Sequence, residues 1–234
     1  MRASIVLLAW VSGQAALASV PFTLVDPSGL AAEVEFTLLD STHLEVRARN
    51  ISFAVPPGFL AADQLLTGVS WDFGASGAAP GDPLIIGGFV QMSVGSYTID
   101  FDAGNYGPGT DVSGEYGYSN LDGTGMLQNF FSANGAQTTP FGGPNLDGPP
   151  NLNGPQAGMV ADPVLVPLGG VGAIQNEVLA TLTIDQNLGD LNFLFENSVR
   201  VEFGSGAAFI TLPEPDTLAG LAIGLSVLTR RARR

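Results

Sequence analysis

Cysteine and lysine are absent from this 234-residue sequence, and His43 is its only histidine. Without cysteine the chain forms no disulfide, and one histidine cannot build a zinc site of the usual kind. Charged residues make up only 13% of the chain, and 22 acidic residues against 8 arginines give a net charge of −14. A chain this acidic repels phosphate backbones. We therefore expect no nucleic-acid partner.

Glycine and proline, by contrast, are abundant, with 31 and 16 copies. Both residues interrupt helix interiors, which disfavours a helical bundle. The 45% of apolar residues disfavours a disordered acidic tail. At roughly 150 residues per domain, the length fits one domain or two small ones. The fold must therefore rest on a hydrophobic core.

The N-terminus has the three parts of a secretory signal peptide. Arg2 precedes a short apolar run over 5–11, and small residues follow up to Ala18. The run is shorter than the roughly 20 apolar residues of a membrane span. We therefore predict that 1–18 is a signal peptide, which signal peptidase cuts between Ala18 and Ser19. The alternative is a buried first helix, which would retain Met1.

The C-terminus also has three parts. Pro213, Glu214 and Pro215 form an extended, helix-forbidding segment. An apolar helix is predicted from Leu218 to Thr229, with a length of about 18 Å at ~1.5 Å per residue. That is shorter than a hydrocarbon core of about 30 Å. Four arginines then favour the cytoplasmic side of a membrane and are the predicted membrane-stop charges; they are Arg230, Arg231, Arg233 and Arg234.

This tail, 213–234, resembles the PEP-CTERM sorting signal of bacterial exosortase substrates. The resemblance implies that a membrane-embedded exosortase, a cysteine protease or transpeptidase, recognises Pro213, Glu214 and Pro215. It implies that the helix is a transient inner-membrane anchor that is later removed. The rest of the protein then reaches the cell surface or extracellular matrix of a Gram-negative-type bacterium. The alternative is a chance Pro-Glu-Pro before an ordinary C-terminal anchor.

The body between these signals, 19–212, holds 20 acidic and 3 basic residues, a net charge of −17. Apolar and polar residues alternate strictly over 31–40 and again over 43–49, with a short link between them. Alternation of this kind predicts a hairpin of half-buried strands. We expect Arg47 and Arg49 to lie across from Glu33 and Glu35 on the solvent face, as charge-matched pairs.

Further short strands are predicted along the body, separated by glycine, proline, asparagine or aspartate. Their spacing indicates a mainly β, antiparallel β-sandwich of jelly-roll-like type, with long Gly/Pro/Asn loops and only the short C-terminal hydrophobic helix. One or two helical turns are expected within 59–66. Trp71 is predicted to lie in the core, and the alternative is an exposed, sugar-stacking ring. The predicted strands are 68–73, 84–92, 96–101, 159–166, 178–184, 191–196 and 198–203.

Two stretches, 104–125 and 132–158, interrupt the strands. The second contains the unit Pro-Asn-Leu-Asx-Gly-Pro twice, at 144–149 and 150–155, which favours consecutive tight turns. Together with the segments at 66–72 and 199–204, the loop at 145–149 is similar to one group of exosortase-dependent surface proteins. That similarity implies location and class, and it implies no chemistry.

No catalytic residue is predicted, and we expect no enzyme. A Ser-His-Asp triad would have to use His43, which lies at a turn. Carboxylates are the abundant functional groups, and two incomplete calcium-loop patterns occur. Turn-forming residues on solvated loops are the simpler interpretation, and no other cofactor is expected. The calcium candidates are Asp100, Asp102, Asp185, Asn187 and Asp190.

These features predict an exported surface or matrix protein with a structural or adhesive role. A carbohydrate-binding or calcium-dependent adhesion module is the alternative, and a secreted hydrolase comes third. The partners expected are signal peptidase, the exosortase, the inner membrane and exopolysaccharide. The carbohydrate alternative requires Trp71, or the tyrosines Tyr106, Tyr116 and Tyr118, to be exposed in a groove.

Overall fold

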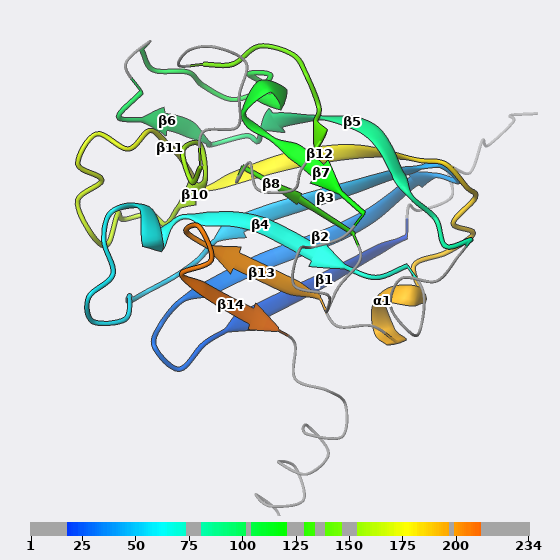
Figure 1. Cartoon of the computed structure of the whole chain (residues 1–234), viewed down its shortest axis with the longest axis horizontal. Coiled ribbons are helices and arrows are strands. Elements are labelled where there is room, and N and C mark those ends of the chain that lie inside the picture. Colours follow the sequence, from blue (N-terminus) through cyan, green and yellow to red (C-terminus); the bar gives the residue numbers. More distant parts are fainter. Residues whose placement is uncertain are drawn as a thin grey trace, which may run out of the picture.

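The protein is mainly β, with mostly antiparallel sheets (Figure 1). It is seen in a computed structural model that describes residues 18–73, 81–101, 104–120, 129–133, 139–146, 154–196 and 199–211. Residues 1–17 of the predicted signal peptide and the whole predicted sorting signal lie outside these residues. The short hydrophobic helix predicted at the C-terminus is therefore outside them too.

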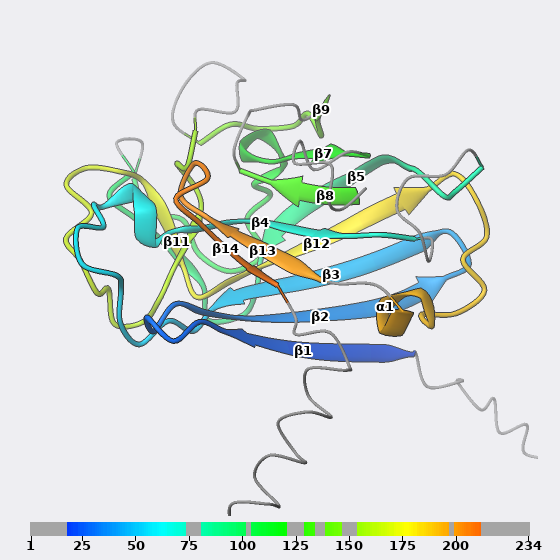
Figure 2. The same cartoon turned by 60° about the horizontal axis from the view of Figure 1, so that its bottom comes forward.

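The first sheet has five strands in the order β1-β2-β3-β12-β5. All its neighbouring strands are antiparallel, and β1 is one edge. Figure 2 shows these strands lying side by side. Their bounds are Ser19–Val25 for β1, Ala31–Asp40 for β2, His43–Asn50 for β3, Glu177–Ile184 for β12 and Ile85–Met92 for β5.

The second sheet has nine shorter strands in its described part, in the order β6-β11-β10-β4-β8-β7-β9, with β13 joined to β4 and β14 to β13. Its pair β10 and β11 is parallel. The bounds are Leu66–Trp71 for β4, Tyr97–Ile99 for β6, Gly117–Ser119 for β7, Asn129–Ser132 for β8, Thr139–Pro140 for β9, Met159–Val160 for β10, Ala173–Gln175 for β11, Arg200–Phe203 for β13 and Ala208–Thr211 for β14.

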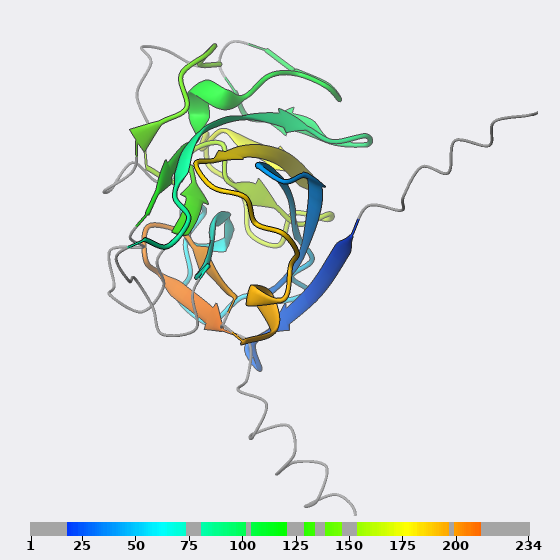
Figure 3. The same ribbon diagram turned by 90° about the vertical axis from the view of Figure 1, so that its right-hand side faces the viewer.

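One hydrophobic core lies between the two sheets, which curve around it in Figure 3. Phe36 from β2 meets Trp71 from β4 edge to face, with ring centroids 5.2 Å apart. Trp71 in turn contacts Phe73 at 6.0 Å. Trp71 is fully buried, so the prediction that it belongs to the core is confirmed. Apolar burial of this kind is the main favourable term in folding.

The predicted hairpin is confirmed in position and register. Strand β2 spans the predicted range, and β3 extends one residue further, to Asn50. Glu33 lies opposite Arg49 and Glu35 opposite Arg47. Arg47 forms an ion pair with Glu35, and the Arg49 guanidinium lies 3.9 Å from the Glu33 carboxylate. The expected charge matching on the solvent face is therefore present.

Most of the other predicted strands are found, some of them shortened. β5 and β12 match closely, whereas β10 ends at Val160. Two prolines follow it, Pro163 after a cis peptide bond and Pro167. Neither has a backbone N–H with which to extend the ladder. The helical turn expected within 59–66 is the 3-10 helix Ala62–Gln64. No predicted strand range covers β1, β7, β8, β9, β11 or β14.

The predicted strand at 191–196 is wrong, because the chain forms the one-turn helix α1 at Phe193–Glu196. The Leu194 N–H donates to the Leu191 carbonyl at 3.1 Å, and both side chains are buried. Asp190 accepts the Asn192 N–H at 2.9 Å just before this turn. Buried leucines three residues apart fit a helical turn, whereas a strand would bury alternate residues.

Among the described strands, β1 pairs only with β2 and so forms an edge of the first sheet, and Pro21 lies on it. The Leu38 N–H donates to the Ala18 carbonyl at 3.0 Å, so these two residues form a hydrogen-bonded pair. Because such pairs alternate along an antiparallel ladder, the backbone groups that point toward β2 are those of residues 18, 20, 22 and 24. Pro21 is one of the alternate residues of β1, whose backbone groups point away from β2. It therefore costs the ladder no hydrogen bond, and it removes one outward donor from the edge.

No helix among the described residues is long and apolar enough to cross a membrane.

Candidate functional site

The predicted processing sites adjoin the two ends of the described body. Ala18 and Ser19 are exposed, and Ser19 is the first residue of β1. The last strand, β14, ends at Thr211. Only Leu212 then separates that strand from Pro213 in the sequence. The recognition residues Pro213, Glu214 and Pro215, and the four terminal arginines, lie outside the described residues.

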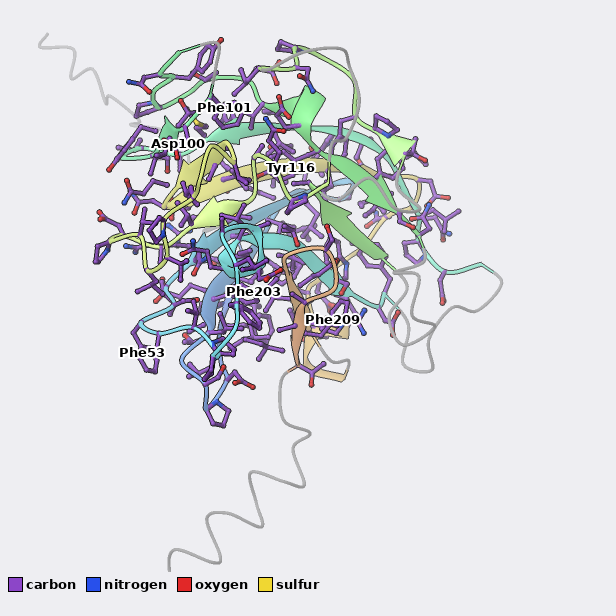
Figure 4. The ribbon with its side chains drawn as sticks, turned by 60° about the vertical axis from the view of Figure 1, so that its left-hand side comes forward. Phe53, Asp100, Phe101, Tyr116, Phe203 and Phe209 are labelled. Carbon is purple, nitrogen blue, oxygen red and sulfur yellow. The ribbon has the colours of Figure 1, made fainter. Side chains whose placement is uncertain are left out.

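The aromatic residues named for sugar stacking are not gathered in an exposed groove. Trp71 and Tyr116 are fully buried. Figure 4 places Tyr116 inside the body, where its hydroxyl donates to the Ala157 carbonyl at 2.6 Å. Burial raises the pKa of Tyr116 far above its usual value, and the neighbouring Glu115 adds to the rise. Tyr106 and Tyr118 pack, partly buried, against the core.

Three of the calcium candidates use their oxygens to accept hydrogen bonds from the protein itself. Asp185 accepts the Leu84 N–H at 2.8 Å, and Asn187 accepts the Gly189 N–H at 2.9 Å. Asp190 accepts from both the backbone and the side chain of Asn192. Asp100 has a left-handed backbone, with φ of 59°, and Asp102 lies outside the described residues. No three acidic or histidine side chains of the described ranges are grouped as a metal site; calcium binding stays a prediction.

His43 lies at the start of β3, where it closes the hairpin with Asp40. The ring Nδ1 is 2.7 Å from the Asp40 carboxylate, and both side chains are about half exposed. The Thr42 N–H, followed by the His43 ring, lowers the pKa of Asp40. These contacts make a turn, and within the described residues no serine or threonine hydroxyl bonds to the ring. The absence of a catalytic role stays a prediction.

The solvent side of the first sheet carries charged or polar side chains on all five strands. We call it the outer face. Because side chains alternate across a sheet, the strand registers place its residues in rows that cross four or five strands. One row is Thr23-Glu33-Arg49-Glu177, the next is Pro21-Glu35-Arg47-Leu179-Gln91, and the third is Ser19-Thr37-Glu45-Thr181-Phe89.

The outer face concentrates the positive charge of the described body. Arg47 and Arg49 are exposed on it, whereas Arg200, the other arginine of the described ranges, is 4% exposed. Each of the two exposed arginines has a glutamate opposite it on β2. Partial burial, followed by repulsion from Glu35, raises the pKa of Glu45, and Arg47 offsets part of that rise.

Two hollows lie on this face and meet at Arg47. One, of about 240 Å³, lies over β1, β2 and β3 and is lined by Thr23, Glu33 and Arg49 among others. The second, of about 520 Å³, lies over β3, β12 and β5 and is lined by Glu45 and Gln91 among others. Glu35, Arg47 and Glu177 line both hollows.

The sequence predicts the part of this face that lies on β2 and β3, but not the part on β12 and β5. Strict alternation in β2 and β3 predicted that Glu33, Glu35, Arg47 and Arg49 share a solvent face. It did not predict that β12, about 130 residues further along, pairs with β3, or that β5 follows. The sequence predicted a strand over 178–184, but the neighbour that this strand pairs with depends on the packed fold.

Comparison of the chain with protein families, with curated proteins and with solved structures found no match.

Proposed function

We propose that this chain is an exported bacterial surface or matrix protein that is processed at both ends. Signal peptidase cuts between Ala18 and Ser19, and an exosortase recognises Pro213, Glu214 and Pro215. The β body then serves a structural or adhesive role in the envelope or the exopolysaccharide matrix, without enzymatic activity. The jelly-roll-like sandwich is part of the same proposal.

The observation that carries this proposal is the fit between the folded body and the two signals. The first strand begins at Ser19, directly after the predicted cut, and the last ends at Thr211, two positions before Pro213. Removing both signals therefore leaves every described strand complete. If 1–18 were instead a buried first helix of the core, we would not expect the cleavage boundary to coincide with the start of the first strand.

Composition supports the destination. The body of 19–212 has a net charge of −17 and no lysine. A high negative charge keeps a protein soluble and separates it from anionic neighbours. With no cysteine in the chain, the fold needs no oxidant outside the cytoplasm.

Fractionation of producing cells tests the sorting step. We expect the chain with Pro213, Glu214 and Pro215 all changed to alanine to accumulate in the inner membrane, because the exosortase no longer recognises it. The matched control is Pro27→Ala, in the exposed turn between β1 and β2, which should be sorted as wild type. Equal distribution of the triple variant and the wild type would refute the proposed sorting.

A further inference from the structure

The outer face has a chemistry that export and sorting do not use. Its three rows present carboxylates, guanidinium groups, hydroxyls and an amide over five adjacent strands. Neighbouring strands are about 4.8 Å apart, so these groups form a regular two-dimensional array. Two hollows cross the array and share Glu35, Arg47 and Glu177. A surface of this form suits an extended, hydrogen-bonding ligand.

The two arginines of the face are each paired with a glutamate within the face itself. Arg47 pairs with Glu35, and Arg49 lies between Glu33 on β2 and Glu177 on β12. Polar groups that are ionised and held in place give the strongest hydrogen bonds. What the face offers beyond the rest of this acidic body is therefore directed hydrogen bonding from carboxylates and guanidinium groups that lie side by side.

An exposed aromatic ring lies on the same face of β5 as one of the residues that line the second hollow. Phe89 on β5 lies opposite Thr181 in the third row and is 45% exposed. Gln91, two residues along the same strand face, lines the hollow. An exposed aromatic ring beside fixed donors and acceptors matches a sugar ring, which has an apolar C–H face and polar hydroxyl edges.

We propose that the outer face binds a neutral polysaccharide chain. Its hydroxyls donate to Glu45, Glu35 and Glu177 and accept from Arg47, while one sugar ring stacks on Phe89. The chain runs across the strands through both hollows. This inference deepens the proposed function, on which it rests for the protein's location in a polysaccharide matrix, and it names the surface that makes the contact.

The alternatives have a poorer fit. An anionic polysaccharide meets four glutamates on the face and a body of charge −17. A cationic peptide would be attracted to the acidic body as a whole, with no need of this face. An added peptide strand binds a sheet edge through backbone groups, and Pro21 removes one of the donors from the β1 edge.

Calorimetric titration of protein purified from producing cells tests this inference. The probes are neutral hexasaccharides of glucose, mannose and galactose, with hexalysine as a cationic probe. We expect a neutral probe to bind, and Glu45→Gln and Phe89→Ala each to weaken that binding about tenfold or more. The matched control is Tyr97→Ala, because Tyr97 has the same 45% exposure on the second sheet. Its affinity should equal that of wild type.

Salt separates this binding from general attraction. Affinity for the neutral probe should change less than about twofold between about 50 and about 500 mM salt, since no net charge is neutralised. The inference is overturned if no neutral hexasaccharide binds, if Tyr97→Ala weakens binding as much as Phe89→Ala, or if only hexalysine binds. Sorting is measured in cells by fractionation, so a failure there and a failure here are distinguishable.

Discussion

Trp71 is the residue on which the core between the two sheets depends most. It is fully buried and contacts aromatic rings on both sides, Phe36 from the first sheet and Phe73 beyond its own strand. T-shaped ring pairs add stability beyond the area they bury. Its contact with Phe36 joins the second sheet to the first.

We expect Trp71→Ala to lower the free energy of unfolding by about 3–5 kcal/mol, because it loses buried area and leaves a cavity. Urea denaturation followed by circular dichroism measures this change. Tyr97→Ala, at an exposed position, should stay within about 0.5 kcal/mol of wild type. An equal loss of unfolding free energy in the two variants would contradict the importance of Trp71 for the core.

Glu45 is the acidic residue whose ionisation opposes folding. Burial and the negative charge of Glu35 raise its pKa, so the folded state favours the protonated form. A group with a raised folded-state pKa contributes stability below its unfolded pKa and loses that contribution as the pH rises through its folded-state pKa. At pH 7 the ionised Glu45 therefore costs stability.

Glu45→Gln should consequently be more stable than wild type at pH 7. The difference should shrink as the pH falls through the raised pKa of Glu45 and vanish below about 4, where wild type is protonated as well. Thermal unfolding over a pH series measures it. A stability difference that does not change with pH would mean that the raised pKa is absent. A stable variant also ensures that lost sugar binding is not lost folding.

At the scale of elements, strand edges decide whether this molecule stays separate from its copies. The outward backbone groups of β1 belong to the odd-numbered residues, since Ala18 and Leu38 form a hydrogen-bonded pair. An unpaired edge is a template for another strand. Pro21 interrupts this template at its middle.

Pro21→Val should therefore promote self-association, because valine restores an outward N–H and favours strands. Light scattering coupled to size-exclusion chromatography measures the mass of the particles. Thr23→Val, two residues further along the same edge, is the control, since it changes the side chain and leaves the backbone donor in place. Association of both variants to the same extent would assign the effect to hydrophobicity.

The elements differ in how well the sequence predicts them, for physical reasons. β2 and β3 have one buried and one solvated face, so strict alternation predicts their range, pairing and ion pairs. β4 is buried along its whole length, and its bounds shift by about two residues. In α1, apolar residues crowd a short segment, and spacing alone does not separate a helical turn from a strand.

Strand β1, which was not predicted, begins directly after the predicted signal peptide and contains Pro21. Proline usually counts against a strand, and only an edge position makes it compatible. Edge position depends on which strands find neighbours, which is a property of the whole fold. For the same reason, the sequence predicted the charges of the outer face on β2 and β3 and not those of β12 and β5.

At the scale of the whole molecule, charge is divided between the body and its ends. Twenty of the 22 acidic residues lie in 19–212, whereas five of the 8 arginines lie in the two terminal signals. Under the proposed processing, the mature protein is more acidic than the encoded chain. In this proposal the basic ends belong to export and sorting, and the mature body lacks them.

Intact-mass analysis of the cell-bound and released protein tests the central claim, processing at both ends, most directly. We expect wild type to begin at Ser19 and to have lost the helix and the four terminal arginines. The variant with Pro213, Glu214 and Pro215 changed to alanine should also begin at Ser19 but retain its tail. The same C-terminal mass in the two proteins, or retention of Met1 in the exported protein, would contradict the account.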